Sequence, residues 1–471
     1  MVVSLPTIAR DLNLSESLLL WPAAVSSLSC GCTLLVCGSI SDVVGGRRTY
    51  LLGTAFLAAT TIACALARNG VELIAFRTAQ GLAMAFCLPS SVLLITSNIP
   101  EGHSRNIAFA CLGAGQPVGF GAGLVIGGLL IECLNWRSGY YIGSGLTFAI
   151  FLASIFALPA DIVESVPISI IFRRMGTEVD WFGCFLLSTS LGLFSYIFAV
   201  LATCPENFLH PTPSALFVVA LLLIPKFAYW IHRQERLGRK AVIPPSLWTN
   251  RLFTSLCVIV FFVWGCFNAT QYFITLYFQL VEDLSPVQTA VRFLPQVIVG
   301  AVTNLMTGWL VKHVRANYLI IGSCIITSIC PLLMATIDPS WSYWHSAFFA
   351  LCFIPVCADV LFPVGNLLIV SLFPPETHGL AGGVFNTVSN IGNSVGLAVT
   401  AMITTSVTRT KIMDNASVVD AMLGGYRASF LTCFAAHVLV LVIVVFGMRN
   451  VGKVGVEAEK GSPMNDMEGT E

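Results

Sequence analysis

Hydrophobic residues along this chain gather in long runs that are separated by short polar stretches. The runs are about 20 residues long or longer, which is the length at which an α-helix crosses the hydrocarbon core of a bilayer. They do not alternate apolar and polar residues, as the strands of a membrane β-barrel do. The pattern therefore predicts an all-α integral membrane protein. Its predicted whole spans are residues 18–41, 50–67, 71–97, 105–131, 138–159, 181–202, 214–231, 252–277, 289–311, 318–337, 345–373, 381–407 and 425–447.

The beginning of the chain differs from the other apolar runs. Met1–Ile8 (MVVSLPTI) is too short to span a membrane, and a polar loop, Ala9–Ser17, follows it at once. It has neither the basic region nor the cleavage site of a signal peptide. We expect it to be the end of a first transmembrane helix that is largely missing from this chain. The expected domains are residues 1–160 (N-terminal bundle), 161–231 (a cytoplasmic stretch and two extra central helices), 232–251 (a basic cytoplasmic loop), 252–447 (a C-terminal six-helix bundle) and 448–471 (a disordered cytoplasmic tail).

Composition excludes several classes of function. The chain is 56% hydrophobic and 10% charged, whereas a soluble domain is about a quarter charged. Its formal net charge is zero, so nothing in the charge balance favours a nucleic-acid partner. The 16 cysteines are scattered, mostly inside apolar runs, without metal-ligand spacing, and are interpreted as small buried hydrophobic residues. No clustered Ser/His or His/Asp/Glu set is present, so we expect no enzyme, no cofactor and no metal site.

The distribution of Lys and Arg predicts the orientation in the membrane. If the loop after the first full span is cytoplasmic, most basic residues fall in cytoplasmic segments and the C-terminus is cytoplasmic. The outer segments then hold only Arg10, Arg68, Arg137, Arg409, Lys411 and Arg427. We expect a multi-pass protein of the plasma membrane. The outer sequon at Asn415 is a weak candidate for glycosylation.

The stretch Gly113–Gly128 (GAGQPVGFGAGLVIGG) is rich in glycine at helical spacing. Its stripe has no side chains on one face, so another helix can approach closely in the bilayer. Pro117 removes one backbone hydrogen bond and is expected to bend the helix. We interpret the stripe as a surface that slides or rocks against a partner, and a static glycine zipper is the alternative. The stripe consists of Gly115, Gly119, Gly123 and Gly127.

The loop Gly38–Arg48 (GSISDVVGGRR) resembles the signature between the second and third helices of the major facilitator superfamily. A carboxylate at a helix end beside cations can lock one domain arrangement and release another. Val43 and Gly46 stand where the family usually has basic residues, and an ordinary positive-inside loop is the alternative. The matching residues are Asp42, Gly45, Arg47 and Arg48.

Further stretches extend this resemblance over essentially the whole chain. Leu73–Gly81 (LIAFRTAQG) places Arg77, Gln80 and Gly81 on one helical face, and an arginine inside a span is a functional candidate by default. The glycine stripe resembles the antiporter motif. The chain is most similar to fourteen-spanner drug:proton antiporters, in particular fungal exporters related to aminotriazole and boron resistance. The phrases that carry this are NWRSGYY (135–141), VDWFG (179–183), FNATQYFITLYFQ (267–279) and TAVRFLP (289–295).

Asp359 is the most informative carboxylate, because it falls in the middle of a span between Pro355 and Pro363. A charge at that depth is costly, and burial favours its neutral form, so we expect proton exchange there together with Arg77. A fixed ion pair or a protonated structural donor is the alternative.

Polar faces on other predicted spans supply a candidate substrate cavity. These residues either contact the substrate or form structural hydrogen bonds between helices, and both alternatives stay open. The candidates are Asn268, Gln271, Tyr272, Asn386 and Asn390. A second stripe could face the glycine stripe across the domain interface, and its members are Gln296, Gly300, Asn304 and Gly308. Arg292 is interpreted either as a snorkelling residue or as part of a gate.

The resemblance implies a major facilitator fold of two six-helix bundles plus two extra central helices. It further implies alternating access, in which proton entry drives export of small toxic compounds or metabolites. The expected partners are a small-molecule substrate, protons and the lipid bilayer, and we expect a monomer. Alternatives are a low-affinity transporter of a small inorganic or nitrogen species such as borate or ammonium, and a non-transporting sensor or inactive truncated product.

Overall fold

The computed structural model describes residues 4–14, 18, 21–100, 103–159, 168–203, 211–238, 242–243, 245–373 and 375–449. Regular structure in these ranges is helical throughout. The helices are α1 (Leu5–Asp11), α2 (Trp21–Val44), α3 (Gly46–Leu66), α4 (Gly70–Asn98), α5 (His103–Cys133), α6 (Trp136–Ala157), α7 (Ile168–Glu178), α8 (Trp181–Thr203), α9 (Pro211–Arg236), α10 (Ser246–Thr249), α11 (Arg251–Leu276), η4 (Tyr277–Val281), α12 (Pro286–Arg292), α13 (Leu294–His313), α14 (Ala316–Ala335), α15 (Ala347–Leu372), α16 (Pro375–Met413) and α17 (Val418–Gly447).

Each predicted span falls on helical structure, which confirms the all-α membrane fold. In the described part, 11 helices are long and apolar enough to cross a membrane, and Val118–Cys133 and Trp181–Phe194 are shorter apolar segments. One predicted span is divided between α12 and α13, where Phe293 ends one helix and Pro295 lies in the first turn of the next. Proline suits a first helical turn because its missing N–H would have no partner there.

The polar stretch before residue 180 contains a helix, α7, that apolar runs of about 20 residues do not predict. α7 is amphipathic and only 11 residues long, too short to span a bilayer. Ile171 on its apolar side is buried, and Met175 packs against the core, whereas Arg173 and Arg174 are exposed. α7 therefore packs against α2 without being long enough to cross the membrane beside it.

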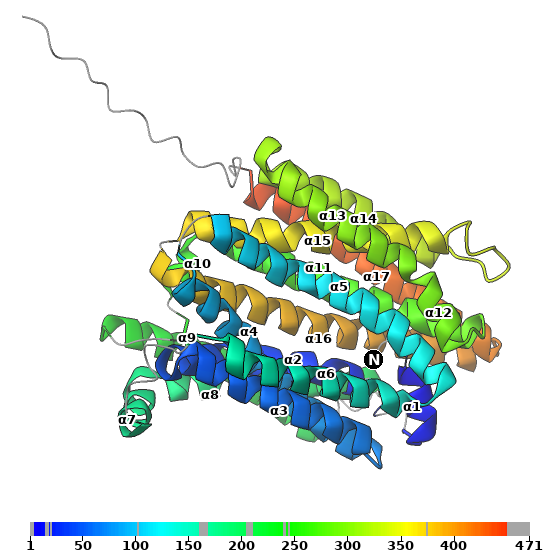
Figure 1. The fold of residues 1–471 in the computed structure, drawn as a ribbon. Helices are drawn as coiled ribbons and strands as arrows, with labels where there is room; N and C mark the ends of the chain where they lie inside the picture. The colour runs from blue at the N-terminus through cyan, green and yellow to red at the C-terminus, as the bar shows by residue number, and fades with distance from the viewer. Residues whose placement is uncertain are drawn as a thin grey trace, which may run out of the picture.

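The helices form two groups that run roughly alongside each other (Figure 1). In the N-terminal group α2 packs on α4, and α3 packs on both α4 and α6. In the C-terminal group α11 packs on α16 and α17, and α15 packs on α13 and α14. The pair α8 and α9 lies beside α2 and α16 through α8. Contacts of α2 with α16, and of α5 with α12 and α13, join the two groups.

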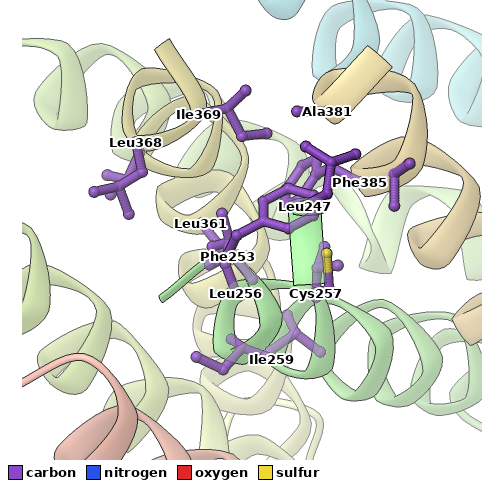
Figure 2. Packing of buried hydrophobic residues seen from close by; sticks show 14 of the residues in the cluster. Leu247, Phe253, Leu256, Cys257, Ile259, Leu361, Leu368, Ile369, Ala381 and Phe385 are labelled. Atoms are coloured by element: carbon purple, nitrogen blue, oxygen red, sulfur yellow. The ribbon is translucent and has the colours of Figure 1, made fainter. Parts of the chain in front are cut away.

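Aromatic and branched aliphatic residues form the larger core of the C-terminal group. Figure 2 shows Phe253 and Leu256 of α11 with Leu361 of α15 and Phe385 of α16, all buried. Leu35 of α2 belongs to the same cluster, so the core extends across the two groups. Lipid tails are as apolar as these side chains, so their packing stabilises the fold through van der Waals contact rather than through removal from water.

Candidate functional site

Arg77 on α4 is held by oxygen atoms from two helices. Its Nε donates to Pro22 O at 3.1 Å, and its guanidinium nitrogens donate to Ser26 Oγ at 2.8 Å and to Gln80 Oε1 at 2.6 Å. Gln80 Nε2 in turn donates to Thr61 Oγ1 of α3 at 2.8 Å. The predicted face of Arg77 and Gln80 is thus a polar network that joins α2, α3 and α4.

Close packing of α2 on α4 makes this network possible. A Cβ added at Gly81 would collide with Ser26 O, so only glycine allows the two backbones to approach at this point. Among described carboxylates, none lies within ion-pair distance of Arg77, whose partners are all neutral. Its positive charge is therefore dispersed over hydrogen bonds without being neutralised.

Asp359 lies on α15 where that helix packs against α13. Its carboxyl group forms a side-chain hydrogen bond with Asn304. A Cβ added at Gly300 would lie 2.6 Å from Asp359 Oδ2 and 3.4 Å from Pro355 Cβ, so the absence of a side chain at Gly300 makes room for the carboxyl. In the described ranges Asp359 has no cationic partner and does not contact Arg77. The structure thus places the two candidates for proton coupling in separate helix groups.

This arrangement corrects the expectation for the two small-residue stripes. Gly300 faces Asp359 rather than α5, and a Cβ at Gly308 would meet no described atom within 4 Å. Cβ atoms on the glycine stripe would likewise meet no described atom within 4 Å, and the stripe comprises Gly115, Gly119, Gly123 and Gly127. α5 instead contacts the C-terminal group through Gly121 against Val297 and through Gly128, whose Cβ would lie 2.7 Å from Ala290 Cβ.

The physical reason is helical geometry. At about 100° per residue, Gly121 and Gly128 fall on the opposite side of α5 from the stripe. α5 continues past Pro117 as one helix, but the side chain of Pro117 lies outside the part that the structure describes.

α11 and α16 cross with their backbones almost touching. A Cβ at Gly265 would lie 2.8 Å from Gly392 O, and one at Gly392 would collide with Phe261 O. Asn268 Nδ2 donates to Asn393 O across this crossing at 3.3 Å. Of the two interpretations of Asn268, the contact corresponds to interhelical hydrogen bonding.

Asn386 and Asn390 are engaged within their own helix. Asn386 Nδ2 donates to Gly382 O, and Asn390 Nδ2 donates to Asn386 O, both at 2.9 Å. Asn390 also lies at the boundary between the two groups, since a Cβ at Gly31 of α2 would be 3.0 Å from Asn390 Cβ. Ser394 on the same helix donates to Ala24 O at 3.2 Å. Asn390 and Ser394 therefore lie at the α2–α16 interface.

Gln271 and Tyr272 on α11 are both buried, at 2% and 8% exposure. Gln271 Nε2 has no hydrogen-bond partner in the described part of the chain, and neither has the indole nitrogen of Trp264. These residues are seven positions apart, so they lie on nearly the same face of α11, about 10 Å apart along its axis. Buried polar groups are normally satisfied, so two open donors on one face are candidates for binding a ligand.

The loop between α2 and α3 has the geometry that its glycine predicts. Gly45 adopts φ 101° and ψ 147°, a region favoured only by glycine, and begins α3. Arg47 reaches Ile155 O of α6 at 2.8 Å and so ties the loop to a third helix. Asp42 is exposed, and Arg48 is half-buried. Asn415 also has a positive φ, 62°, and lies exposed in the turn between α16 and α17.

A charged cluster near α1 was missed by sequence reasoning, although the phrase NWR lies within a stretch that carries the resemblance. Asp11 Oδ2 accepts from Trp136 Nε1 at 2.8 Å and from Arg137 Nη1 at 2.7 Å. These two hydrogen bonds lower the pKa of Asp11, with the Arg137 charge adding to the effect. Arg137 also donates to Ala67 O at 3.2 Å, so the cluster fastens α1 and α6 to the loop after α3.

Arg292 is the centre of a second cluster. It forms an ion pair with Glu282, and its guanidinium lies 5.0 Å from the ring centre of Phe278 and 5.1 Å from that of Tyr343. A freely snorkelling side chain would not be held on three sides, so Arg292 connects η4, α12 and the residues before α15.

Two groups of apolar helices, close helix crossings at glycine and polar side chains within those helices together describe a multi-pass membrane protein. The model of the Major Facilitator Superfamily matches residues 1–397. This chain belongs to that superfamily.

Relatives of known name agree with this class. "MFS-type transporter 1" of Pyricularia oryzae is 40% identical, over 97% of this chain and 81% of that protein. "Efflux pump terJ" of Aspergillus terreus is 24% identical over 84% of this chain and 75% of its own length. "Low affinity ammonium transporter" of Saccharomyces cerevisiae is 24% identical over 87% of this chain and 77% of its own length.

Solved structures show the same fold. A bacterial homologue of the human lysosomal transporter Spinster, in an inward-facing and occupied conformation, superposes with a TM-score of 0.60 at 18% identity and covers 95% of this chain and 92% of its own. The human organic anion transporter MFSD10 superposes with a TM-score of 0.59 at 15% identity, and the match covers 94% of this chain and 88% of that one.

Proposed function

We propose that this protein is a proton-coupled antiporter that exports small toxic compounds or metabolites by alternating access. The observation that carries the proposal is Asp359, a carboxyl group in a membrane helix with an amide as its partner and no cation beside it in the described part. A carboxylate anion at that depth in the membrane is costly in free energy. The protonated, neutral form of Asp359 is therefore accessible without strong acid. The names of relatives such as "Efflux pump terJ" support the export of small compounds.

Asn304 is suited to a carboxyl group that changes its protonation state. An asparagine side chain donates through its NH₂ and accepts through its oxygen. It therefore can donate to the charged carboxylate and, after rotation of the amide, accept from the protonated acid. A lysine or arginine in its place would favour only the charged form. The Asp359–Asn304 pair is our candidate site for the transported proton.

The face of α11 suggests which chemistry the substrate presents. Trp264 Nε1 and Gln271 Nε2 are donors without acceptors. A compound with carbonyl, ether or hydroxyl oxygens would supply those acceptors, and the surrounding aromatic residues would contact its apolar body. We therefore favour uncharged or weakly polar organic compounds.

A second candidate function is low-affinity transport of a small nitrogen species, because one relative is named a low affinity ammonium transporter. Ammonium is itself a donor and would not satisfy the open donors on α11. We further propose that the protein is a plasma-membrane monomer with a cytoplasmic C-terminus, as the Lys/Arg distribution indicates.

The proposal is tested by transport into proteoliposomes against an imposed pH gradient, with a panel of toxic organic compounds and with methylammonium. Asp359→Asn should remove proton-driven accumulation while exchange of substrate for substrate continues. The matched control is Asp338→Asn, in an exposed loop outside the spans. If Asp359→Asn concentrates substrate like the parent, Asp359 does not carry the coupling proton. Uptake of methylammonium alone would favour the second candidate.

A further inference from the structure

The end of α9 is fastened to the turn between α7 and α8, and the transport mechanism proposed above does not use this junction. Trp230 Nε1 of α9 donates to Asp180, at 2.9 Å from Oδ1 and 3.2 Å from Oδ2. Asp180 Oδ1 also accepts from Gly183 N at 2.9 Å, at the start of α8. Trp181 Nε1 donates to Met175 O of α7 at 2.8 Å. Figure 1 shows α7 at the same end of the molecule as α9 and α10.

Two cations of α9 lie over aromatic rings at this junction. Lys226 Nζ is 5.9 Å from the ring centre of Phe182, and the guanidinium carbon of Arg233 is 5.9 Å from that of Trp230. The two rings pack edge to face, with their centres 4.5 Å apart. Lys226 and Arg233 are seven residues apart, so they lie on nearly the same face of α9, about 10 Å apart along its axis. The rings hold both cations beside the start of α8.

Positive charge exceeds negative charge around the junction. The carboxylates with described side chains are Asp180, whose oxygens already accept from Trp230 and Gly183, and the exposed Glu235. A surface of this sign attracts an anionic ligand. The exposed cations are Arg173, Arg174, Lys226, Arg233 and Arg236.

The order of residues along α9 matches the order of groups in a phospholipid. α9 packs on α8, and in the turns before its cations it exposes Leu221, Leu222 and Ile224. In a bilayer these apolar side chains contact acyl chains. The cations follow toward the end of the helix, where Arg233 and Arg236 lie in the last turn. One ligand with apolar chains and an anionic headgroup would contact both parts.

Neighbouring residues place the junction at the boundary between hydrocarbon and water. Trp181 and Tyr229 are exposed there, and such aromatic residues are enriched at membrane interfaces. α7 is amphipathic, with Ile171 buried and Arg173 exposed, and is too short to span the bilayer. A short helix with cations on its polar side is typical of a segment that lies in the membrane interface.

We propose that the junction of α7, α8 and α9 is a binding site for an anionic phospholipid. Lys226, Arg233 and Arg236 contact the headgroup, and the acyl chains lie along the exposed apolar side of α9. A zwitterionic phospholipid also carries a phosphate, but it brings a cation to the same surface, so the net negative charge of the headgroup is what the site selects. If this end of α9 is cytoplasmic, as the Lys/Arg distribution predicts, the site faces the leaflet that carries anionic lipids.

The test uses the purified, delipidated full chain in a neutral detergent, offered equal amounts of phosphatidylserine and phosphatidylcholine with the same acyl chains. Native mass spectrometry measures how much of each lipid is retained. The parent should retain several-fold more phosphatidylserine. Arg233→Gln/Arg236→Gln should lose most of this preference, and Arg233→Lys/Arg236→Lys should keep most of it, because lysine preserves the charge. The control Arg315→Gln/Arg449→Gln removes the same charge from exposed positions of the C-terminal group and should behave like the parent.

A competition experiment separates a lipid site from a site for soluble anions. Excess inorganic phosphate should leave phosphatidylserine bound, because phosphate has no acyl chains to contact α9. Displacement by phosphate, equal retention of the two lipids by the parent, or an equal loss of preference in the control variant would overturn the proposal. Lys226→Gln replaces Arg233→Gln/Arg236→Gln if that variant is not monodisperse in size-exclusion chromatography. None of these readouts requires transport, so they stand apart from the proposed antiport.

Discussion

Arg77 in the N-terminal group and Asp359 in the C-terminal group are both ionisable residues inside membrane helices, yet they are held differently. Arg77 donates to Pro22, Ser26 and Gln80 and is part of a network over three helices. Asp359 has an amide partner on one neighbouring helix. Removing Arg77 leaves several acceptors unsatisfied, whereas changing the charge of Asp359 disturbs one bond. The comparison suggests that the first charge fixes structure and the second is free to exchange a proton.

The largest effect should follow from removing Arg77, the member of this pair with the larger number of hydrogen bonds. Arg77→Ala leaves Ser26, Gln80 and Pro22 O without their donor, at a cost of about 1–3 kcal/mol in stability. We expect transport to be lost and the thermal unfolding midpoint to fall. Arg77→Lys should restore part of both, because a point charge cannot reproduce the planar fork. Unchanged stability in Arg77→Ala would show that the network is not structural.

A substitution at Gly300 tests the role of Asp359 without replacing an ionisable residue. In Gly300→Ala the new Cβ would lie 2.6 Å from Asp359 Oδ2, so the carboxyl must turn away from its place. We expect proton-driven accumulation in proteoliposomes to fall several-fold. Gly308→Ala is the matched control on the same helix, because its Cβ would meet no described atom within 4 Å. Equal transport by both variants would contradict a coupling role for the Asp359–Asn304 pair.

Gln271 and Asn268 extend the comparison to uncharged residues on one helix. Gln271→Leu removes a buried donor that has no partner, so stability should be unchanged or slightly higher while transport falls. Asn268→Leu removes the bond to Asn393 O and should lower stability by about 0.6 kcal/mol. Thermal unfolding and transport rates are measured for both. A loss of stability in Gln271→Leu with full transport would assign Gln271 to structure.

The spans could be predicted because hydrocarbon thickness sets a length that every apolar run must meet. Gly45 was also recognisable, since its loop needs a backbone conformation that glycine alone favours. Which face of α5 packs was not predictable, because that helix carries glycines on two sides and only tertiary contact distinguishes Gly121 from Gly119.

The smallest expected effect concerns the cluster of Asp11, Trp136 and Arg137. Like Arg77, Asp11 has several hydrogen-bond partners, but it lies outside the predicted spans. Trp136 and Arg137 lower the pKa of Asp11 below its ordinary value of 3.8. The charged form therefore stabilises the fold above about pH 4, and this contribution is lost as the pH falls through the lowered pKa.

Because Asp11 and Arg137 keep 45% and 28% of their side chains exposed, solvent screens the pair and it contributes at most about 1 kcal/mol. Asp11→Asn should accordingly lower the unfolding midpoint slightly at neutral pH and weaken its dependence on pH between about 5 and 3. The exposed Asp414→Asn serves as control. If Asp11→Asn lowers the midpoint as far as Arg77→Ala does, the network around Arg77 is no more important to the N-terminal group than a surface cluster. The contrast between fixed and exchanging charges would then have to rest on Asp359 alone.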